Sequence, residues 1–502
     1  MGNITKMAHG ALKHRVIQDL RRNRVNDAVR LPERQVLPRG VDHAVDMAKL
    51  TEKSKPSSLS VLVLDFKDAF MSIPLAEAER PYNCSVIPEG VRRQRDALHP
   101  EEPEEGQCIV WRVLGFGGKP NPLVYSRAAS FAMRSAQAMY SASRRGGEAS
   151  MKSQLYVDDP AICVSGTSSE RNAALDVVLL WWMTLGIPLV WKKGAVVEGK
   201  APHDWIGVTY QLQRPGLVTM KLPAEYLASV LEVLQPFCET HGRASYRDAE
   251  RMVGKAGRIA QVVPGARPFL SGLYAALAAT KKDMENGKNK TKGSRIATSR
   301  FNVSARWLRA LIEGEGDTLL PLERKVFSKK PAPASTAEWV IQFDACTTGG
   351  GAVLRCNQVI TEYFVVKWEA NMVQGLDVEV RQSKHQTFWE FLALLISMVI
   401  WGHYFKVQAV AVVGDNIGAL THALEMKAKG TLAVVARELS WRKERFRWAF
   451  EVGHIPSELN VVADALSRQF EPQPPVWPVQ ALREAKEVLP PNLCSLWRTL
   501  SR

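Results

Sequence analysis

Asp158 and Asp159 are adjacent acidic residues that lie between two short apolar runs, Leu155–Val157 and Ala161–Val164. Each run has the length of a half-buried strand, and the Asp-Asp-Pro sequence between them favours a turn, so we expect a β-hairpin with two carboxylates at its tip. Adjacent carboxylates repel each other, and hard divalent cations such as Mg²⁺ bind carboxylate oxygens and substrate phosphates. The pair therefore predicts a cation site, with a solvated surface turn as the alternative.

A third acid, Asp65, ends the continuous apolar run Val61–Leu64. Such a run is typical of a central strand that is buried on both faces. A carboxylate at the end of a buried strand is costly unless it is paired or coordinated. Two strand-borne acid sites on one chain suggest a pair of cations that serves phosphoryl chemistry.

A second set of acids occurs in the C-terminal part of the chain. Asp344 and Asp415 each end a strand-like apolar run, Glu390 lies in an otherwise apolar helical segment, and Asp464 follows His454. Each of these acids needs a partner or a cation if it is buried. Any one of them could be an unrelated strand-end or capping acid, but all four in this order, downstream of the first set, argue against that explanation.

The segments that hold these acids resemble two known families. Tyr156–Asp159 is similar to the YxDD box of reverse transcriptases, and Leu64–Phe70 is similar to their first palm motif, Asp-x-x-x-Ala-Phe/Tyr. The C-terminal order of acids, which ends in a His-x5-Asn-x3-Asp pattern, resembles ribonuclease H, and Asn460–Arg468 is similar to retroelement members in particular. By resemblance, the chain is identified as a retroelement reverse transcriptase of the DIRS-type or long-terminal-repeat-like group with a C-terminal ribonuclease H domain.

The resemblance to reverse transcriptases implies a two-metal site for nucleotidyl transfer. Asp65 and Asp158 would hold two Mg²⁺ ions, with Asp159 in support and Mn²⁺ as an alternative metal. Arg15 matches the fingers arginine that contacts the triphosphate of the incoming nucleotide, and a guanidinium suits phosphate oxygens. A solvated basic strand is the alternative explanation for Arg15.

Two further residues acquire roles from the same resemblance. Phe70 matches an aromatic residue under the nucleotide sugar, where a bulky ring would clash with a 2′-hydroxyl and select deoxynucleotides. Lys193, or Lys192, matches a lysine that approaches the leaving pyrophosphate. The alternatives are a core aromatic residue for Phe70 and an ordinary strand-end lysine for Lys193.

The resemblance to ribonuclease H implies that Asp344, Glu390, Asp415 and Asp464 hold a second pair of Mg²⁺ ions. His454 is expected on a mobile loop, where it serves proton transfer or product release. We predict that it is not a ligand, because Mg²⁺ prefers oxygen to imidazole. An exposed loop histidine without a role is the alternative.

The elements that must position these residues predict a multidomain chain of the α+β and α/β classes. The resemblance implies a right-hand polymerase with partial fingers, a palm and a helical thumb, followed by a ribonuclease H-like mixed β-sheet domain with helices. The fingers look truncated, because the fingers motif lies close to residue 1. The expected domains are 1–222 for the partial fingers and palm, 223–278 for the thumb, 279–335 for a basic linker or connection, 336–470 for the ribonuclease H-like domain and 471–502 for a Pro-rich tail.

Local patterns predict several elements within these domains. Ser245 and Asp248 form a capped helix start. The other expected elements are helices over 123–140 and 173–185, a short strand over 189–193 that ends in lysines, and a hairpin over 204–210 that resembles the primer grip.

The composition fits a polyanionic partner. The 502 residues include 66 basic and 51 acidic side chains, a net charge of +15, which suits nucleic acid. The resemblance to reverse transcriptases and ribonuclease H implies an RNA or DNA template-primer, an RNA–DNA hybrid and deoxynucleoside triphosphates as partners. The sequence does not predict an oligomeric state.

The sequence also predicts an intracellular location, cytoplasmic or nuclear, and not secretion. The seven cysteines are odd in number and form no Cys-x-x-Cys pair, which favours a reducing compartment. No apolar core follows Met1, and the apolar runs over 177–191 and 391–401 are too short or too interrupted to span a membrane.

Three functions remain open at the level of the sequence. The first is an active reverse transcriptase with ribonuclease H. The second is a degenerate or co-opted element that binds nucleic acid without full catalysis, and the third is a scaffold without an enzymatic role.

Overall fold

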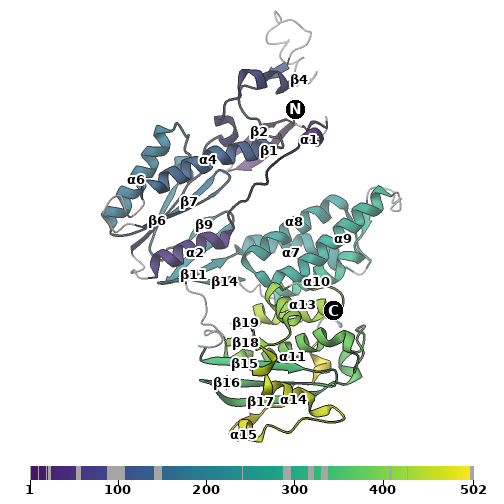
Figure 1. Cartoon of the computed structure of the whole chain (residues 1–502). Helices are drawn as coiled ribbons and strands as arrows, with labels where there is room; N and C mark the ends of the chain where they lie inside the picture. The colour runs from purple at the N-terminus through teal and green to yellow at the C-terminus, as the bar shows by residue number, and fades with distance from the viewer. Residues whose placement is uncertain are drawn as a thin grey trace, which may run out of the picture. The chain divides into compact units, whose positions relative to one another are not determined.

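The chain is a mixed α/β protein with several sheets, as the sequence predicts (Figure 1). It divides into two compact units, Met1–Met220 with Lys325–Ser328 and Lys221–Arg324 with Lys329–Arg502. The computed structural model describes residues 2–8, 11–18, 20, 24–52, 58–86, 108–140, 150–239, 241–286, 295–314, 322–328, 337–405, 410–426 and 428–497.

The first unit is built on a four-stranded antiparallel sheet in the order β6-β7-β3-β8. The interior strand β3 is the apolar run before Asp65, and its burial on both faces explains its continuous apolar sequence. The strands are β3 (Leu59–Val63), β6 (Ser150–Tyr156), β7 (Asp159–Ser165) and β8 (Ala195–Glu198).

Helices cover both faces of this sheet. Ile162 and Val164 of β7 pack in a core with α4 and α6, while Cys163, which points to the opposite face, contacts His43 of α2. The helices are α2 (Gly40–Thr51), α4 (Asn121–Ala138) and α6 (Ser168–Thr184), so α6 begins earlier than the expected helix over 173–185.

The expected hairpin with two acids at its tip is present. Tyr156 of β6 pairs with Asp159 of β7, which leaves Val157 and Asp158 as the turn. Val157 has φ of 58°, a backbone conformation that is strained for a β-branched residue. A tight turn therefore sets Asp158 and Asp159 beside β3, the strand that leads to Asp65.

The expected strand over 189–193 is wrong. Leu189 makes a single antiparallel bridge with Phe66, and Trp191–Lys193 then form a 3₁₀ turn, η4. The place beside β3 is taken by β8, which begins at Ala195. The chain must turn between the bridge and β8, and this turn lies at the two lysines.

The first unit contains three further groups of strands. A second sheet has the order β14-β11-β10-β9, and its β9–β10 hairpin is the one expected over 204–210. Arg15 lies in β2, opposite Ile4 of β1, and its side chain lies outside the described part of the structure. The remaining bounds are β1 (Gly2–Ala8), β2 (Ala11–Ile17), α1 (Val25–Ala28), β4 (Cys84–Val86), β5 (Cys108–Val110), β9 (His203–Trp205), β10 (Val208–Arg214), β11 (Leu217–Lys221) and β14 (Glu323–Phe327).

The second unit begins with a group of helices. Ser245 caps α8 and exchanges hydrogen bonds with Asp248, as expected. The range 279–335, expected as a basic linker or connection, contains a further helix, α10, whose Phe301 packs against Phe237 of α7. The bounds are α7 (Ala224–Cys238), β12 (Arg243–Ser245), α8 (Tyr246–Val262), α9 (Arg267–Glu285), β13 (Arg295–Ala297) and α10 (Ser299–Glu313).

A six-stranded sheet in the order β19-β18-β15-β16-β17-β20 forms the rest of the second unit. Strands β15, β16 and β17 are antiparallel, whereas β18 runs parallel to β15 and β19 runs parallel to β18. The bounds are β15 (Trp339–Ala345), β16 (Gly349–Cys356), β17 (Val359–Lys367), β18 (Val410–Gly414), β19 (Phe450–His454) and β20 (Lys486–Glu487).

Each face of this sheet has its own core. Leu354 and Phe364 face α11, α12 and α13, whereas Val353 and Ile360 face Leu466 of α14 and the C-terminal segment. Helices α11 and α14 lie against the sheet (Figure 1). The helices are α11 (Gln386–Trp401), α12 (Ile417–Glu425), α13 (Leu432–Phe446), α14 (Val461–Ser467) and α15 (Val479–Leu482).

Two expectations about this unit concern its apolar run over 391–401 and its segment after residue 470. The segment Ser383–Tyr404 is long and apolar enough to cross a membrane by length and composition, but 72% of its apolar 18-residue window is buried in the protein, as in a core helix. The segment after residue 470 adds β20 to the sheet and buries Trp497, whose indole N–H donates to the Met372 carbonyl at 2.5 Å. The expected Pro-rich tail is therefore packed onto the sheet.

Two candidate carboxylate sites

The first candidate site lies where β3 and the β6–β7 hairpin meet. Asp65 follows β3, and the Asp158 carbonyl accepts a hydrogen bond from the Phe66 N–H at 2.9 Å. This backbone contact ties the turn that carries Asp158 and Asp159 to the segment that carries Asp65. The three acids therefore lie at one end of the central sheet.

Electrostatics show that these three acids are neighbours. Burial, and then the charges of Asp158 and Asp65, raise the pKa of Asp159 to about 6. Burial and the same three acids also raise the pKa of Tyr125 on α4. Like charges gathered in a partly buried place are stabilised by a cation, so the donor set fits a hard divalent metal.

Lys193 is part of this site. Its ammonium group forms an ion pair with the Asp65 carboxylate, although the two residues are far apart in the sequence. The Lys193 side chain is 53% exposed, whereas that of Asp65 is 16% exposed. The 3₁₀ turn η4 thus brings a solvent-facing cation to an acid at the sheet end.

Phe70 borders the same site. It lies on a 3₁₀ turn, η2 (Ala69–Ser72), and its ring packs edge-on against Phe116 and Tyr125 at centroid distances of 5.2 and 5.5 Å. Because Tyr125 feels the charge of all three acids, this aromatic cluster adjoins the carboxylates. Its proposed contact with a nucleotide sugar stays a prediction.

Sequence reasoning missed Trp205. This residue of β9 is 2% exposed, and its indole N–H donates to the Asp159 backbone carbonyl at 3.0 Å. The contact links the β9–β10 hairpin to the acidic turn. A buried tryptophan in a strand gives no sequence signal for such a bond, because its partner is a backbone atom.

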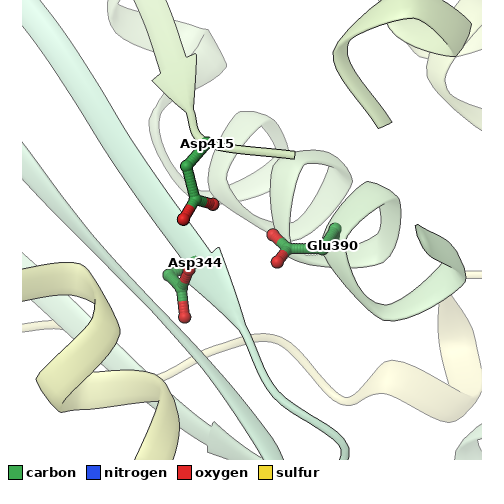
Figure 2. A group of neighbouring side chains, drawn as sticks. All are labelled: Asp344, Glu390 and Asp415. Atoms are coloured by element: carbon green, nitrogen blue, oxygen red, sulfur yellow. The ribbon is translucent and has the colours of Figure 1, made fainter. Parts of the chain in front are cut away.

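The second candidate site joins three acids of the second unit. Ligand oxygens of Asp344, Glu390 and Asp415 all lie within 4.8 Å of one another. Figure 2 shows Glu390 projecting from its helix towards the two aspartates at the strand ends. Asp344 lies near the end of β15 and Asp415 directly follows β18, its parallel neighbour, so the two strands deliver their acids to the same sheet edge.

Burial makes this cluster unstable as a set of bare anions. Asp344 and Glu390 are 4% and 3% exposed. Burial raises the pKa of Asp344 to about 7, with the charge of Asp415 adding to the effect and the Ser467 hydrogen bond opposing it. Burial and the charges of Asp344 and Asp415 raise the pKa of Glu390 well above its ordinary value.

The cluster fits a divalent cation. Glu390 Oε2 is buried and has no hydrogen-bond partner among the described residues. A buried acceptor without a donor is costly, and a cation between the three carboxylates would remove both this cost and the repulsion. The donors are all carboxylate oxygens, the ligands that Mg²⁺ and Mn²⁺ prefer.

Neutral side chains orient the cluster, and sequence reasoning missed them. Gln386 donates to Glu390 Oε1 at 3.2 Å and to the Ala345 carbonyl at 2.5 Å. The Ser457 hydroxyl donates to Asp415 Oδ2 at 2.6 Å, and the Ser467 hydroxyl donates to Asp344 Oδ2 at 2.5 Å. Only the position of Gln386, one helical turn before Glu390, was a signal in the sequence.

The fourth expected ligand, Asp464, lies apart from the other three. Its carboxylate is 42% exposed and accepts a hydrogen bond from Arg468 Nε at 2.7 Å. Its charge still acts on Asp344. The role of Asp464 as a metal ligand stays a prediction.

The expectation that His454 lies on a mobile loop is wrong. His454 is the last residue of β19 and is paired with Gly414 of β18, the residue before Asp415. The pairing continues to the end of β18, so the strand includes Gly453 as well. His454 is exposed beside the site, and its role in proton transfer stays a prediction.

Comparison with known proteins gives a family for the first part of the chain. Residues 7–210 match the family model described as "Reverse transcriptase (RNA-dependent DNA polymerase)". This part of the chain is therefore a reverse transcriptase domain, and the resemblance is confirmed over this range. Asp65, Asp158, Asp159 and Lys193 all lie within it. None of the curated proteins compared matches the chain.

Two solved structures of a foamy viral protease-reverse transcriptase are similar to the chain. The first, named dRH and in complex with double-stranded DNA, has 14% sequence identity and a TM-score of 0.42, and the match covers 90% of this chain and 64% of that one. The second, also with double-stranded DNA, has 14% identity and a TM-score of 0.40, and the match covers 91% of this chain and 77% of that one. The chain thus spans 64% of the length of the first structure, and likeness of this degree transfers no activity or residue role.

Proposed function

We propose that the chain is an RNA-directed DNA polymerase of a retroelement that also cleaves RNA in RNA–DNA hybrids. The observation that carries the proposal is the pair of carboxylate sites, one inside the reverse transcriptase domain and one in the second unit. Two separate sites that suit divalent metals match two phosphoryl-transfer reactions.

In the polymerase reaction, Asp65, Asp158 and Asp159 would hold the metal ions. Bound Mg²⁺ would supply positive charge for the triphosphate and lower the pKa of the primer 3′-hydroxyl. Lys193, exposed at the rim of the site, is suited to bind the negative charge that forms on the pyrophosphate. Trp205 would hold the Asp159 backbone in place while the nucleotide binds.

In the cleavage reaction, Asp344, Glu390 and Asp415 would hold the metal ions, with Asp464 as a fourth ligand. Gln386 and Ser457 would fix the directions of Glu390 and Asp415. His454, exposed beside Gly414, would accept or donate a proton as the product leaves.

The partners we propose are a template-primer, an RNA–DNA hybrid and deoxynucleoside triphosphates. The net charge of +15 supports a polyanionic partner. Helix α8 carries exposed Arg247, Arg251 and Arg258 on one side, which suits contacts with a phosphate backbone. Binding should therefore weaken steeply as salt is added.

A primer-extension assay tests the proposal. Full-length protein with poly(rA)/oligo(dT), thymidine triphosphate and Mg²⁺ is expected to extend the primer, and a chelator is expected to stop it. Binding of the template-primer without extension, at any Mg²⁺ or Mn²⁺ concentration, would favour the second candidate, a co-opted element that only binds nucleic acid.

A further inference from the structure

Asp344 has an unusual neighbour on its own sheet face. It is paired across the β15–β16 ladder with Gly351, and paired residues point to the same side of a sheet. Its flanking residues Phe343 and Ala345 face the core under α11, so Asp344 and Gly351 face the opposite side, where α14 lies. The residue beside the acid therefore has no side chain.

The missing side chain lets α14 approach the sheet closely. A Cβ atom on Gly351 would lie 2.5 Å from the Leu466 Cβ and 3.0 Å from the Ser467 backbone nitrogen. A Cβ atom on Gly349 would lie 2.9 Å from the Ser467 carbonyl oxygen. The distances of 2.5 and 2.9 Å are shorter than real Cβ atoms allow, so the two glycines form a platform for the last turn of α14.

This close approach delivers Ser467 to the carboxylate. Ser467 is 0% exposed, and its hydroxyl donates to Asp344 Oδ2 at 2.5 Å. The same hydroxyl also lies 2.9 Å from the Asp464 carbonyl, but the carboxylate is nearer and is the stronger acceptor. Cys346 Sγ donates to the Ser467 carbonyl at 3.2 Å and secures the turn from the other side.

We propose that Ser467 is a positioning residue for the second site. Its hydroxyl holds one oxygen of Asp344, which fixes the direction in which the carboxylate faces Glu390 and Asp415. A carboxylate that is held in this way presents its ligand oxygen without an ordering cost when a divalent cation binds. The catalytic consequence rests on the proposed hybrid cleavage, but the effect on metal binding does not.

Mn²⁺ binding to the full-length protein tests the proposal directly. Asp344→Asn first identifies the part of an Mn²⁺ titration that belongs to this site. Ser467→Ala should lower the Mn²⁺ affinity of this site by about 10- to 100-fold, the usual effect of removing an outer hydrogen bond to a metal ligand. Ser467→Cys, which keeps a weak donor of similar size, should give a smaller loss.

Ser397→Ala is the matched control. Ser397 is also 0% exposed, lies in a helix of the same unit and donates only to a helix carbonyl, that of Ala393 at 2.8 Å. It should leave the Mn²⁺ affinity of the site unchanged. Wild-type Mn²⁺ affinity in both Ser467→Ala and Ser467→Cys would overturn the proposal, and if Ser467→Ala does not fold, Ser467→Cys decides alone.

A second readout separates this proposal from the function on which its catalytic part rests. Ser467→Ala should raise the Mg²⁺ concentration for half-maximal hybrid cleavage while the KM for the hybrid stays the same, and DNA synthesis should not change. If the wild-type protein cleaves no hybrid, the proposed cleavage function is wrong, whereas the Mn²⁺ comparison still decides the role of Ser467.

Discussion

Trp205 and Ser467 each donate one hydrogen bond at a carboxylate site, the first to the Asp159 backbone and the second to the Asp344 side chain. Both residues are buried, and neither carries a charge. The acids themselves could be found in the sequence because a charged residue in an apolar run is conspicuous. The residues that orient them could not, because a buried serine or tryptophan has the same appearance in any core.

Trp205→Phe tests whether the indole N–H matters for DNA synthesis. The ring remains, but the Asp159 carbonyl loses its donor, and an unsatisfied buried group costs roughly 1–3 kcal/mol. We expect DNA synthesis to fall by about 10-fold and hybrid cleavage to stay the same, as measured on one preparation.

Trp181→Phe is the control for this change, because its indole N–H in the same unit donates to Ser135 at 2.8 Å, a contact that involves none of the three acids. Equal losses in the two variants would assign the effect of Trp205 to general stability and contradict the positioning role.

Phe70→Val tests whether the Phe70 ring, on η2, selects the sugar of the incoming nucleotide. Its edge-on contacts with Phe116 and Tyr125 hold it beside the acids, where a large ring would exclude a 2′-hydroxyl. Misincorporation of ribonucleotides, measured as the ratio of kcat/KM values, should rise. Phe131→Val, an exposed position on α4, is the control. Unchanged selectivity in Phe70→Val would return this residue to a packing role.

At the scale of elements, the sequence predicts what periodicity and turn chemistry determine. The β6–β7 hairpin, the buried strand β3 and the capped start of α8 follow from such local rules. The turn at Lys193 and the extension of β19 to His454 do not, because both depend on which strand lies alongside. Helix α10 lies within 279–335, the range expected as a basic linker or connection, and follows the basic, aperiodic run in that range.

A pair of histidines joins α2 to β9 in the first unit. His43 Nε2 and His203 Nε2 lie 2.9 Å apart, and the two side chains are buried. One imidazole must accept the hydrogen bond, so at least one of them is neutral. Burial lowers the pKa of His203 to about 4, and burial followed by the charge of His203 lowers the pKa of His43 well below its usual value.

This pair makes α2 sensitive to acid. In the unfolded chain, His203 takes up a proton as the pH falls below about 6.5. In the folded protein, it does so only near pH 4. The unfolded state therefore binds more protons in this window, and the free energy of unfolding should fall by about 3 kcal/mol across it. The free energy of unfolding can be measured at each pH in a urea series. Peroxide oxidation of Met47, a buried residue of α2, then reports the fraction of protein that is unfolded.

His203→Gln should reduce this pH dependence, because the group that titrates is gone. His241→Gln, at an exposed position of the second unit, should keep it. If the free energy of unfolding falls equally steeply between pH 6.5 and pH 4 in His203→Gln and in the wild-type protein, the acid sensitivity does not come from this pair.

At the scale of the whole molecule, each unit contains its own carboxylate site, and the described acids of each site all belong to that unit. The reverse transcriptase family match covers residues 7–210, which include the first site and not the second. Two sites with separate supports predict two activities that can be lost one at a time.

The most direct measurement of this claim is a comparison of Asp158→Asn and Asp344→Asn, with DNA synthesis and hybrid cleavage assayed in both. Asp158→Asn should abolish DNA synthesis and leave cleavage within a few-fold of the wild-type rate. Asp344→Asn should abolish cleavage and leave synthesis within the same range. Loss of both activities in either folded variant, or retention of both, would contradict the account of two independent metal-dependent sites.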